Sequence, residues 1–285
     1  MSPVDLRALR AFLLAHTVAG LDTVEHLADG SSRHQRWVTG EGGPALLTVT
    51  LPALDVGTPT LAADGPADAV RWALAAGHRW VGLDVDPSAG VSALAEDPVL
   101  GPLVRARPHL RVPGAADPFE TAVLVVLGQH VSLAAGRRFA ARLVASFGVG
   151  CPDGRHRFPG PALLASLDAV ALQRAVGITA SRANAVVALA RAVVDRRLTL
   201  SSTAGRRSTR GVLLDLPGVG PWTADLVALR CLRDPDVFLP GDLVLRRALG
   251  GVSAADAGDM ARAWAPHRSL AVLHLWTDHA LDPHR

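Results

Sequence analysis

The sequence contains no lysine and no tyrosine. All 29 of its basic side chains other than histidine are therefore arginine, whose guanidinium group stays charged near neutral pH. Without a lysine side chain, the protein cannot form a lysine Schiff base with a substrate. Without tyrosine, no phenol is available as an acid, a base or a stacking surface. The composition thus excludes lysine-based covalent catalysis and any site that depends on tyrosine.

Cysteine and long apolar runs are also scarce. Two cysteines, Cys151 and Cys231, cannot form a disulfide framework or supply the four ligands of an iron–sulfur cluster. The histidines lack the spacing of metal ligands, so no catalytic metal is expected. No charge-free apolar run reaches about 18 residues, so no membrane span is expected. The first 20 residues lack a signal-peptide cleavage site, and we expect a cytoplasmic, nucleoid-associated protein.

The hydrophobic residues that are present predict an α+β protein. At 285 residues, 49% hydrophobic and 19% charged, the chain can form two or three lobes around a real core. Residues 1–95 are predicted to form a mixed α/β lobe with a small antiparallel sheet. This lobe would hold a helix at its start, strands at 33–40 and 44–54, and a helix over 67–80. Residues 96–285 are predicted to form an all-helical region in two lobes, with short Pro/Gly corners.

The clearest helix start in this second region is the segment DPFETAVLVVLGQ. Asp117 stands at the N-cap and Pro118 at the first helical position, and Glu120 completes a capping box. The helix is expected to break near Gly128 and to resume in SLAAGRRFAARLVASFG. Periodic apolar residues predict further helices over 161–176, 181–198, 207–216, 224–232, 242–249, 255–265 and 269–281.

The segment LPGVGPWTADL at 216–226 predicts a tight turn between two helices. Gly218 and Gly220 permit unusual backbone angles, and Pro221 suits the first turn of the following helix. Unpaired N–H groups at that helix start, next to glycines, would let a phosphate approach closely. Three arginines just upstream could add positive charge: Arg206, Arg207 and Arg210. The alternative is a plain antiparallel helix pair that turns on glycines.

A second corner, VFLPGDLVLRR at 237–247, places Asp242 at the start of a helix. An aspartate there can act as an N-cap, which contributes about 1 kcal/mol to the helix. It can also be a fixed carboxylate that stabilises positive charge in a transition state. The two roles are compatible. Four other charged residues nearby are expected to be structural or solvated: Asp225, Asp234, Asp236 and Arg268.

Taken in order, several segments resemble the bacterial 3-methyladenine DNA glycosylase II family. This family is the alkylation-repair branch of the helix-hairpin-helix base-excision glycosylases. The resemblance rests on the hairpin, on the Asp242 corner, on WAPHRSLAVLHLW at 264–276, and on segments at 106–143 and 9–28. It covers most of the chain and is weakest near residues 30–65.

The resemblance implies a function on damaged double-stranded DNA. A hairpin at about 213–226 would hold the DNA backbone through Gly218, Val219 and Gly220, and backbone carbonyls there often hold a monovalent cation in the family. No cofactor would be required. Asp242 would catalyse hydrolysis of the N-glycosidic bond, whose transition state carries oxocarbenium-like positive charge. The protein would act as a monomer.

The resemblance also implies a pocket for the flipped base, lined by Trp222, Trp276, Phe12, Leu226 and Leu243. Lyase-type relatives carry lysine at the position of Trp222, so this chain would release the base without cutting the strand. Tryptophan could stack on an electron-poor alkylated purine. The alternative for Trp222 is an ordinary core tryptophan on a helix face. The family's usual pocket tyrosines are replaced by leucine or threonine, at Leu226, Leu243 and Thr277, which leaves the preferred lesion open.

The LGQHVS corner at 127–132 corresponds to the place where the family inserts a side chain into the duplex. The matching wedge here would be His130, with Gln129 beside it. The alternative for His130 is an ordinary surface histidine. For the chain as a whole, the alternative to a glycosylase is a non-catalytic or degenerate helix-hairpin-helix protein that only binds DNA.

Overall fold

The computed structural model describes residues 3–201 and 205–281. The N-terminal part holds a four-stranded antiparallel sheet in the order β2-β3-β4-β6. Its strands are β2 (Asp22–His26), β3 (Ser32–Gly40), β4 (Gly43–Leu51) and β6 (Thr60–Asp64). Two-residue strands pair elsewhere: β1 (Val4–Asp5) with β5 (Val56–Gly57), and β7 (Val149–Gly150) with β8 (His156–Arg157).

One face of this sheet is buried because apolar and polar residues alternate along β4, where Ala45, Leu47, Val49 and Leu51 all point inward. Helix α1 (Leu6–Ala15) and helix α2 (Ala67–Trp80) cover that face. Helix α2 lies very close to the sheet at Gly77. A Cβ atom at this position would lie 2.5 Å from a Leu61 methyl group. Leu9 and Leu13 of α1 share a hydrophobic cluster with Val49 and Leu51 of β4, so the sheet holds α1, which carries Phe12, in place.

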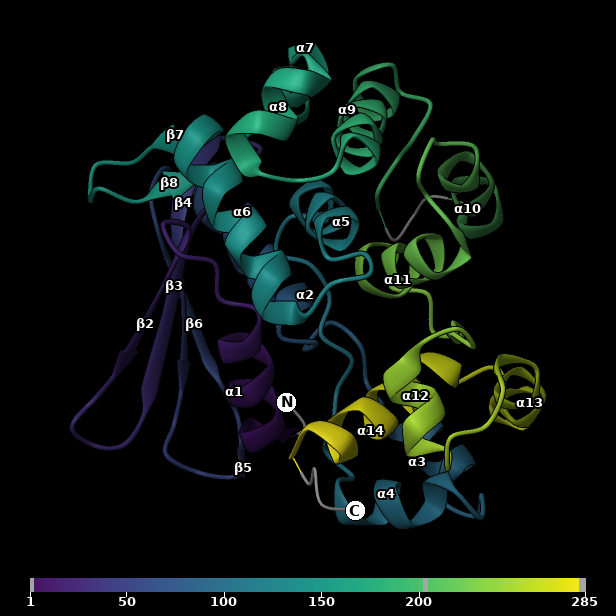
Figure 1. Ribbon diagram of the computed structural model, residues 1–285. Coiled ribbons are helices and arrows are strands. Elements are labelled where there is room, and N and C mark those ends of the chain that lie inside the picture. Colours follow the sequence, from purple (N-terminus) through teal and green to yellow (C-terminus); the bar gives the residue numbers. More distant parts are fainter. Residues whose placement is uncertain (1–2, 202–204, 282–285) are drawn as a thin grey trace.

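Apart from the short β7–β8 pair, the rest of the chain is helical (Figure 1). It has two hydrophobic cores. The first helical lobe contains α5 (Pro118–Leu127), α6 (Leu133–Phe147), α7 (Pro161–Ser166), α8 (Ala169–Val176), α9 (Ala180–Val194) and α10 (Arg206–Leu214). The second contains α3 (Ser88–Leu94), α4 (Leu100–Ala106), α12 (Leu243–Ala248), α13 (Ala254–Met260), a 3-10 helix (Ala261–Trp264) and α14 (Arg268–Leu281). Helix α11 (Pro221–Cys231) contributes to both cores.

The α+β class with a helical hairpin region is confirmed, and so are the strands near 33–40 and 44–54 and the helix over 67–80. Other predictions were wrong in detail. The segment 161–176 forms two helices instead of one, because Asp168 caps α8. By its packing, α3 belongs with the helical region, since Leu94 lies in the core around α14. The predicted domain boundary at residue 95 stays a prediction. Among the described residues, no helix is long and apolar enough to cross a membrane.

A buried cluster of charges joins the sheet to the first helical lobe. The guanidinium of Arg36 on β3 pairs with Glu120 on α5 and with Asp22, 3.3 Å away, and lies over the Trp80 ring. Burial raises the pKa of Glu120 to about 7 and also raises the pKa of Asp22 and of Asp117. The Asp117 N-cap is confirmed, but Glu120 binds Arg36, so its predicted part in a capping box gives way to this pairing.

Candidate active site

Helices α10 and α11 form the predicted hairpin. Gly218 in the turn has a φ of +78°, and a Cβ atom there would crowd Ser181 and Ala185 on α9 at 3.2–3.3 Å. This position therefore requires glycine. Gly220 is different, because a Cβ there would meet nothing within 4 Å. Arg210 on α10 and Asp225 on α11, with a shortest N–O distance of 2.6 Å, brace the two helices.

The start of α11 suits an anion. Its N-cap is Gly220, so no side chain covers the first N–H groups of the helix. The open space beside Gly220 lets a phosphate oxygen come close to them. Val219 between the two glycines is 7% exposed and anchors the turn in the first helical core. The geometry thus agrees with a grip on a DNA backbone through Gly218, Val219 and Gly220, a role that stays a prediction.

Asp242 is half-buried and lies at the N-cap of α12. Its Oδ1 accepts hydrogen bonds from the backbone N–H groups of Val244 and Leu245, both at 3.0 Å. The N-cap prediction is therefore confirmed. The same carboxylate also accepts two hydrogen bonds from side chains, which no local sequence pattern predicts.

Both of the predicted pocket tryptophans donate to this carboxylate. Nε1–H of Trp222 on α11 donates to Oδ2 at 3.0 Å, and Nε1–H of Trp276 on α14 donates to Oδ1 at 3.2 Å. Oδ1 therefore has three donors and Oδ2 has one, so the remaining acceptor capacity belongs mainly to Oδ2. The structure brings three predicted residues together from α11, α12 and α14. It adds that the indoles fix the orientation of the carboxylate.

The other predicted pocket residues lie at different depths. Leu226, one turn after Trp222 on α11, is half-buried and touches both helical cores, whereas Leu243 is 53% exposed beside Asp242. The ring of Phe12 lies under the guanidinium of Arg230, 4.6 Å from its centroid. Residues 222, 226 and 230 share one face of α11 because they are four apart.

The sequence analysis missed two residues beside Phe12, Arg230 and His16, and helical spacing could have indicated both. Arg230 continues the Trp222–Leu226 face, and its Nη2 donates to the Gly114 carbonyl at 3.0 Å. His16, four residues after Phe12, stacks on the Phe12 ring at 4.2 Å. Its Nδ1 lies 2.8 Å from the Phe12 carbonyl. The Phe12 ring thus contacts both a guanidinium and an imidazole.

The predicted wedge turn joins α5 to α6. His130 is exposed and has a φ of +52°, which is uncommon for a residue with a side chain. Ser132 follows it and caps α6, because its Oγ accepts from the Ala135 N–H at 3.2 Å. Unlike the exposed His130, Gln129 is bound to the hairpin through its side chain. Its amide nitrogen donates to the Gly218 carbonyl at 3.0 Å and to Thr223 Oγ1 at 2.7 Å.

The charged residues that were expected to be structural have partners within the protein. Asp236 binds the guanidinium of Arg268 through two hydrogen bonds of 2.7 Å, and this pairing lowers the pKa of Asp236. Asp234 lies 4.0 Å from Arg206. With the Arg210–Asp225 pair, these contacts support the structural interpretation of all four.

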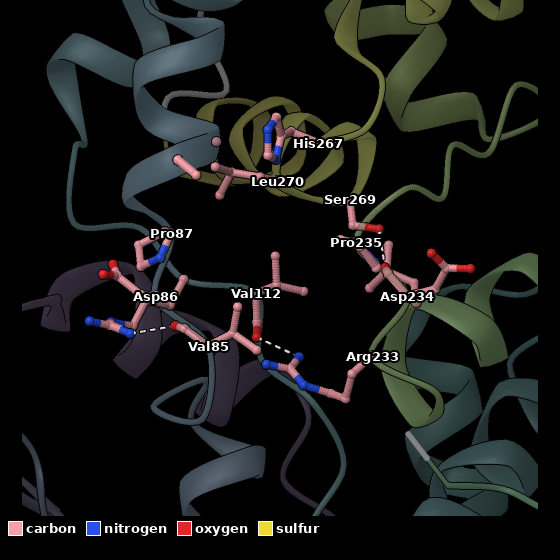
Figure 2. A pocket seen from close by; sticks show the side chains of 14 residues that line it. Val85, Asp86, Pro87, Val112, Arg233, Asp234, Pro235, His267, Ser269 and Leu270 are labelled. Atoms are coloured by element: carbon pink, nitrogen blue, oxygen red, sulfur yellow. Dashed lines mark hydrogen bonds between the residues drawn. The ribbon is translucent and has the colours of Figure 1, made fainter. Parts of the chain in front are cut away.

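A cavity of about 210 Å³ lies elsewhere, between the segment before α3 and the start of α14 (Figure 2). None of the predicted site residues lines it. Its charged walls are already paired: Arg233 binds Asp84 at 2.7 Å and the Val112 carbonyl at 2.8 Å. Ser269 donates to the Asp234 carbonyl at 2.6 Å. The cavity lies where several structural elements meet, and Asp242 is not among its lining residues.

The monovalent cation that the resemblance implies would be held by backbone carbonyl oxygens of the hairpin. The Gly218 carbonyl already accepts a hydrogen bond from Gln129, and the Leu216 carbonyl accepts one from the Val219 N–H. A cation at the turn would have to share these oxygens, and the cation stays a prediction. In the described ranges, no three His, Cys, Asp or Glu side chains gather as a metal ion would require.

Known proteins are similar to this chain in sequence. Residues 1–117 match the family model of the AlkA N-terminal domain. The chain is 37% identical over 284 residues to the probable bifunctional transcriptional activator/DNA repair enzyme AlkA of Mycobacterium tuberculosis, which covers 97% of this chain and 55% of that protein. It is 37% identical over 186 residues to DNA-3-methyladenine glycosylase 2 of Escherichia coli, covering 65% and 66% of the two chains. The chain thus spans about half the length of the Mycobacterium relative.

The fold has a close counterpart among solved structures. The 3-methyladenine DNA glycosylase from Archaeoglobus fulgidus superposes with a TM-score of 0.81 at 20% identity, over 99% of this chain and 97% of that one. An 8-oxoguanine glycosylase/lyase from Clostridium acetobutylicum, solved with double-stranded DNA, gives a TM-score of 0.68 at 16% identity. At these identities the likeness concerns the fold. The sequence matches show that the chain belongs to the AlkA family.

Proposed function

We propose that this protein is a DNA glycosylase that removes alkylated purine bases of the 3-methyladenine class from double-stranded DNA. The observation that carries the proposal is the carboxylate of Asp242. Two backbone N–H groups and two indole N–H groups from three helices converge on it. A side chain that served only as an N-cap would need the backbone bonds alone. The names of the Escherichia coli and Mycobacterium relatives support the same activity.

The proposed chemistry is hydrolysis of the bond between the purine and C1′ of the deoxyribose. As this bond breaks, its electron pair leaves with the base and positive charge develops on the sugar. The carboxylate of Asp242 stabilises that charge, and fixed groups do so more effectively than mobile water. Water then adds its oxygen to C1′, and its proton passes through Oδ2 or directly to solvent. Oδ2 suits this role because it accepts one hydrogen bond, from Trp222, whereas Oδ1 accepts three.

The reaction is proposed to stop at the abasic site. Strand cleavage by the lyase route needs an amine that attacks C1′, and the position equivalent to the lyase lysine is Trp222. No lysine side chain exists elsewhere to replace it. The protein would work as a monomer on DNA in the cytoplasm.

A second candidate is a degenerate relative that binds DNA without excising bases. The observation in its favour is the absence of tyrosine from the pocket, where Leu226, Leu243 and Thr277 stand. The intact arrangement around Asp242 favours catalysis instead.

Base release from alkylated duplex DNA tests the proposal, with abasic-site nicking scored in the same samples. The wild type should release 3-methyladenine or 7-methylguanine and leave strands intact. Asp242→Asn should lower release by about 10²–10³-fold, as expected for the loss of a major electrostatic interaction, with DNA affinity nearly unchanged. Full release by Asp242→Asn would refute the mechanism. DNA binding without release by the wild type would support the degenerate relative.

A further inference from the structure

The contacts of Gln129 assign it a role different from the one its neighbour His130 suggests. Gln129 immediately precedes the exposed His130, yet its amide nitrogen faces the hairpin and makes two hydrogen bonds there. One is to the Gly218 carbonyl, in the turn that would hold the DNA backbone. The other is to the hydroxyl of Thr223, which is 3% exposed and follows Trp222 directly.

The backbone of Gln129 is held as well. The guanidinium of Arg182 on α9 donates to the Gln129 carbonyl, and the same guanidinium lies over the Phe139 ring at 5.8 Å. Ser132 fixes the other side of the turn by capping α6. His130 is therefore anchored on both sides while it adopts a φ of +52°. Such backbone angles persist where the surroundings hold them in place.

We propose that Gln129 is a positioning residue that ties the wedge turn to the hairpin. It does not enter the duplex itself. Through this tie, a DNA backbone seated on the hairpin meets His130 at a fixed distance and angle. The tie also ends at Thr223, next to Trp222 and hence to the donor that orients Asp242. The inference rests on the proposed function, because it assumes that a base is flipped and excised.

The chain offers a conservative set of variants to test this. Gln129→Met keeps the length of the side chain and removes both donors, whereas Thr223→Val keeps the shape of a buried residue and removes the hydroxyl. Thr223→Ser keeps the hydroxyl and serves as the rescue variant. Gln35→Met is the matched control. It removes a similar Gln–Thr bond, from Gln35 Nε2 to Thr48 Oγ1 at 3.0 Å, within the sheet.

Four measurements separate positioning from simple support of the fold. They are thermal unfolding, affinity for duplex DNA, base flipping monitored by 2-aminopurine fluorescence, and single-turnover excision. Gln129→Met should lower flipping and excision about tenfold at saturating DNA, as the loss of two net hydrogen bonds implies. Thr223→Val should lower them about threefold. The double variant should be no worse than Gln129→Met, because the two residues share one interaction. Thr223→Ser and Gln35→Met should match the wild type, and DNA affinity should stay within about twofold.

Two results would overturn the proposal. Weakened DNA affinity in Gln129→Met, beside normal affinity and flipping by Thr223→Val, would mean that Gln129 acts directly on DNA. Wild-type flipping by both variants would mean that the tie does not position the wedge. Failure of the wild type to release any base would count against the proposed function instead. The flipping signal would still decide the role of Gln129.

Discussion

The hydrogen bond from Trp222 to Asp242 is best tested by Trp222→Phe. Phenylalanine keeps an aromatic face for stacking on a base but has no N–H to donate. The substitution therefore separates two roles of Trp222 that the sequence alone cannot separate. One is contact with the base, and the other is orientation of the Asp242 carboxylate through Oδ2 at 3.0 Å.

The size of the effect follows from the hydrogen bond. A bond to a charged group contributes about 1.5–3 kcal/mol. This bond exists before the reaction as well as during it, so only its contribution to orienting the carboxylate affects the rate. We therefore expect the lower end, about 1.5 kcal/mol, which corresponds to roughly tenfold in the rate of excision. Trp276→Phe should cost less, about threefold, because Oδ1 keeps two backbone donors when the 3.2 Å indole bond is lost.

The assay is single-turnover excision with DNA affinity measured on the same duplex. Trp222→Phe should slow excision and leave affinity within about twofold, whereas Trp222→Ala should slow it further by losing roughly 1–3 kcal/mol of stacking. Trp37→Phe is the matched control. It removes a similar indole bond, from Trp37 to Asp153 at 2.8 Å, which joins β3 to an exposed loop. Its excision rate should equal that of the wild type.

Two outcomes would refute the reasoning. Wild-type excision by Trp222→Phe would show that the indole N–H does not orient Asp242 during catalysis. Equal losses in the Phe and Ala variants would show that the aromatic face adds nothing to base recognition. Thermal unfolding of each variant separates these outcomes from loss of packing in the two cores that Trp222 joins.

The remaining predictions concern the wedge and the buried charge cluster. His130→Gly should leave the free energy of unfolding unchanged or raise it by up to about 1 kcal/mol, because glycine accepts the φ of +52° without strain. The same variant should lose base flipping in the 2-aminopurine assay, and retained flipping would argue that His130 is an ordinary surface residue. The raised pKa of Glu120, about 7, means that its proton stabilises the folded state; this contribution is complete below about pH 4.5 and is lost as the pH rises toward 7. Between about pH 4.5 and 7, the wild type should therefore lose on the order of 2 kcal/mol more of its free energy of unfolding, measured in urea, than Glu120→Gln loses. Identical pH profiles for the two proteins would contradict the raised pKa of Glu120.

Much of the fold follows from local patterns in the sequence. The alternation along 33–40 and 44–54 predicts two strands, and Asp117 and Pro118 predict the start of α5, because these signals come from neighbouring residues. Strand β2 carries no such signal, since it lies at the sheet edge and none of its residues is fully buried. Its place is set by pairing with β3.

For the site, too, local sequence patterns predict some features and miss those that depend on distant residues. The glycines of the hairpin and the N-cap at Asp242 can be predicted because each depends on a few adjacent residues. The resemblance to a family supplied Trp222 and Trp276 as pocket residues. It did not supply their hydrogen bonds to Asp242, which join positions 20 and 34 residues apart in the chain. The hydrogen bond from Gln129 is even harder to predict from the sequence, since its partner Thr223 lies 94 residues away.

These long-range bonds explain why the site depends on α11 more than on any single loop. The first turn of this helix carries the N–H groups that suit a phosphate, the hydroxyl of Thr223 that receives Gln129, and the indole that reaches Asp242. Because Pro221, Trp222 and Thr223 are adjacent, a shift of the hairpin moves the wedge and the carboxylate together. Gly218 makes that geometry possible, since only glycine tolerates both its φ of +78° and the close approach of α9. A bulkier residue at 218 should therefore weaken DNA binding, base flipping and excision at once.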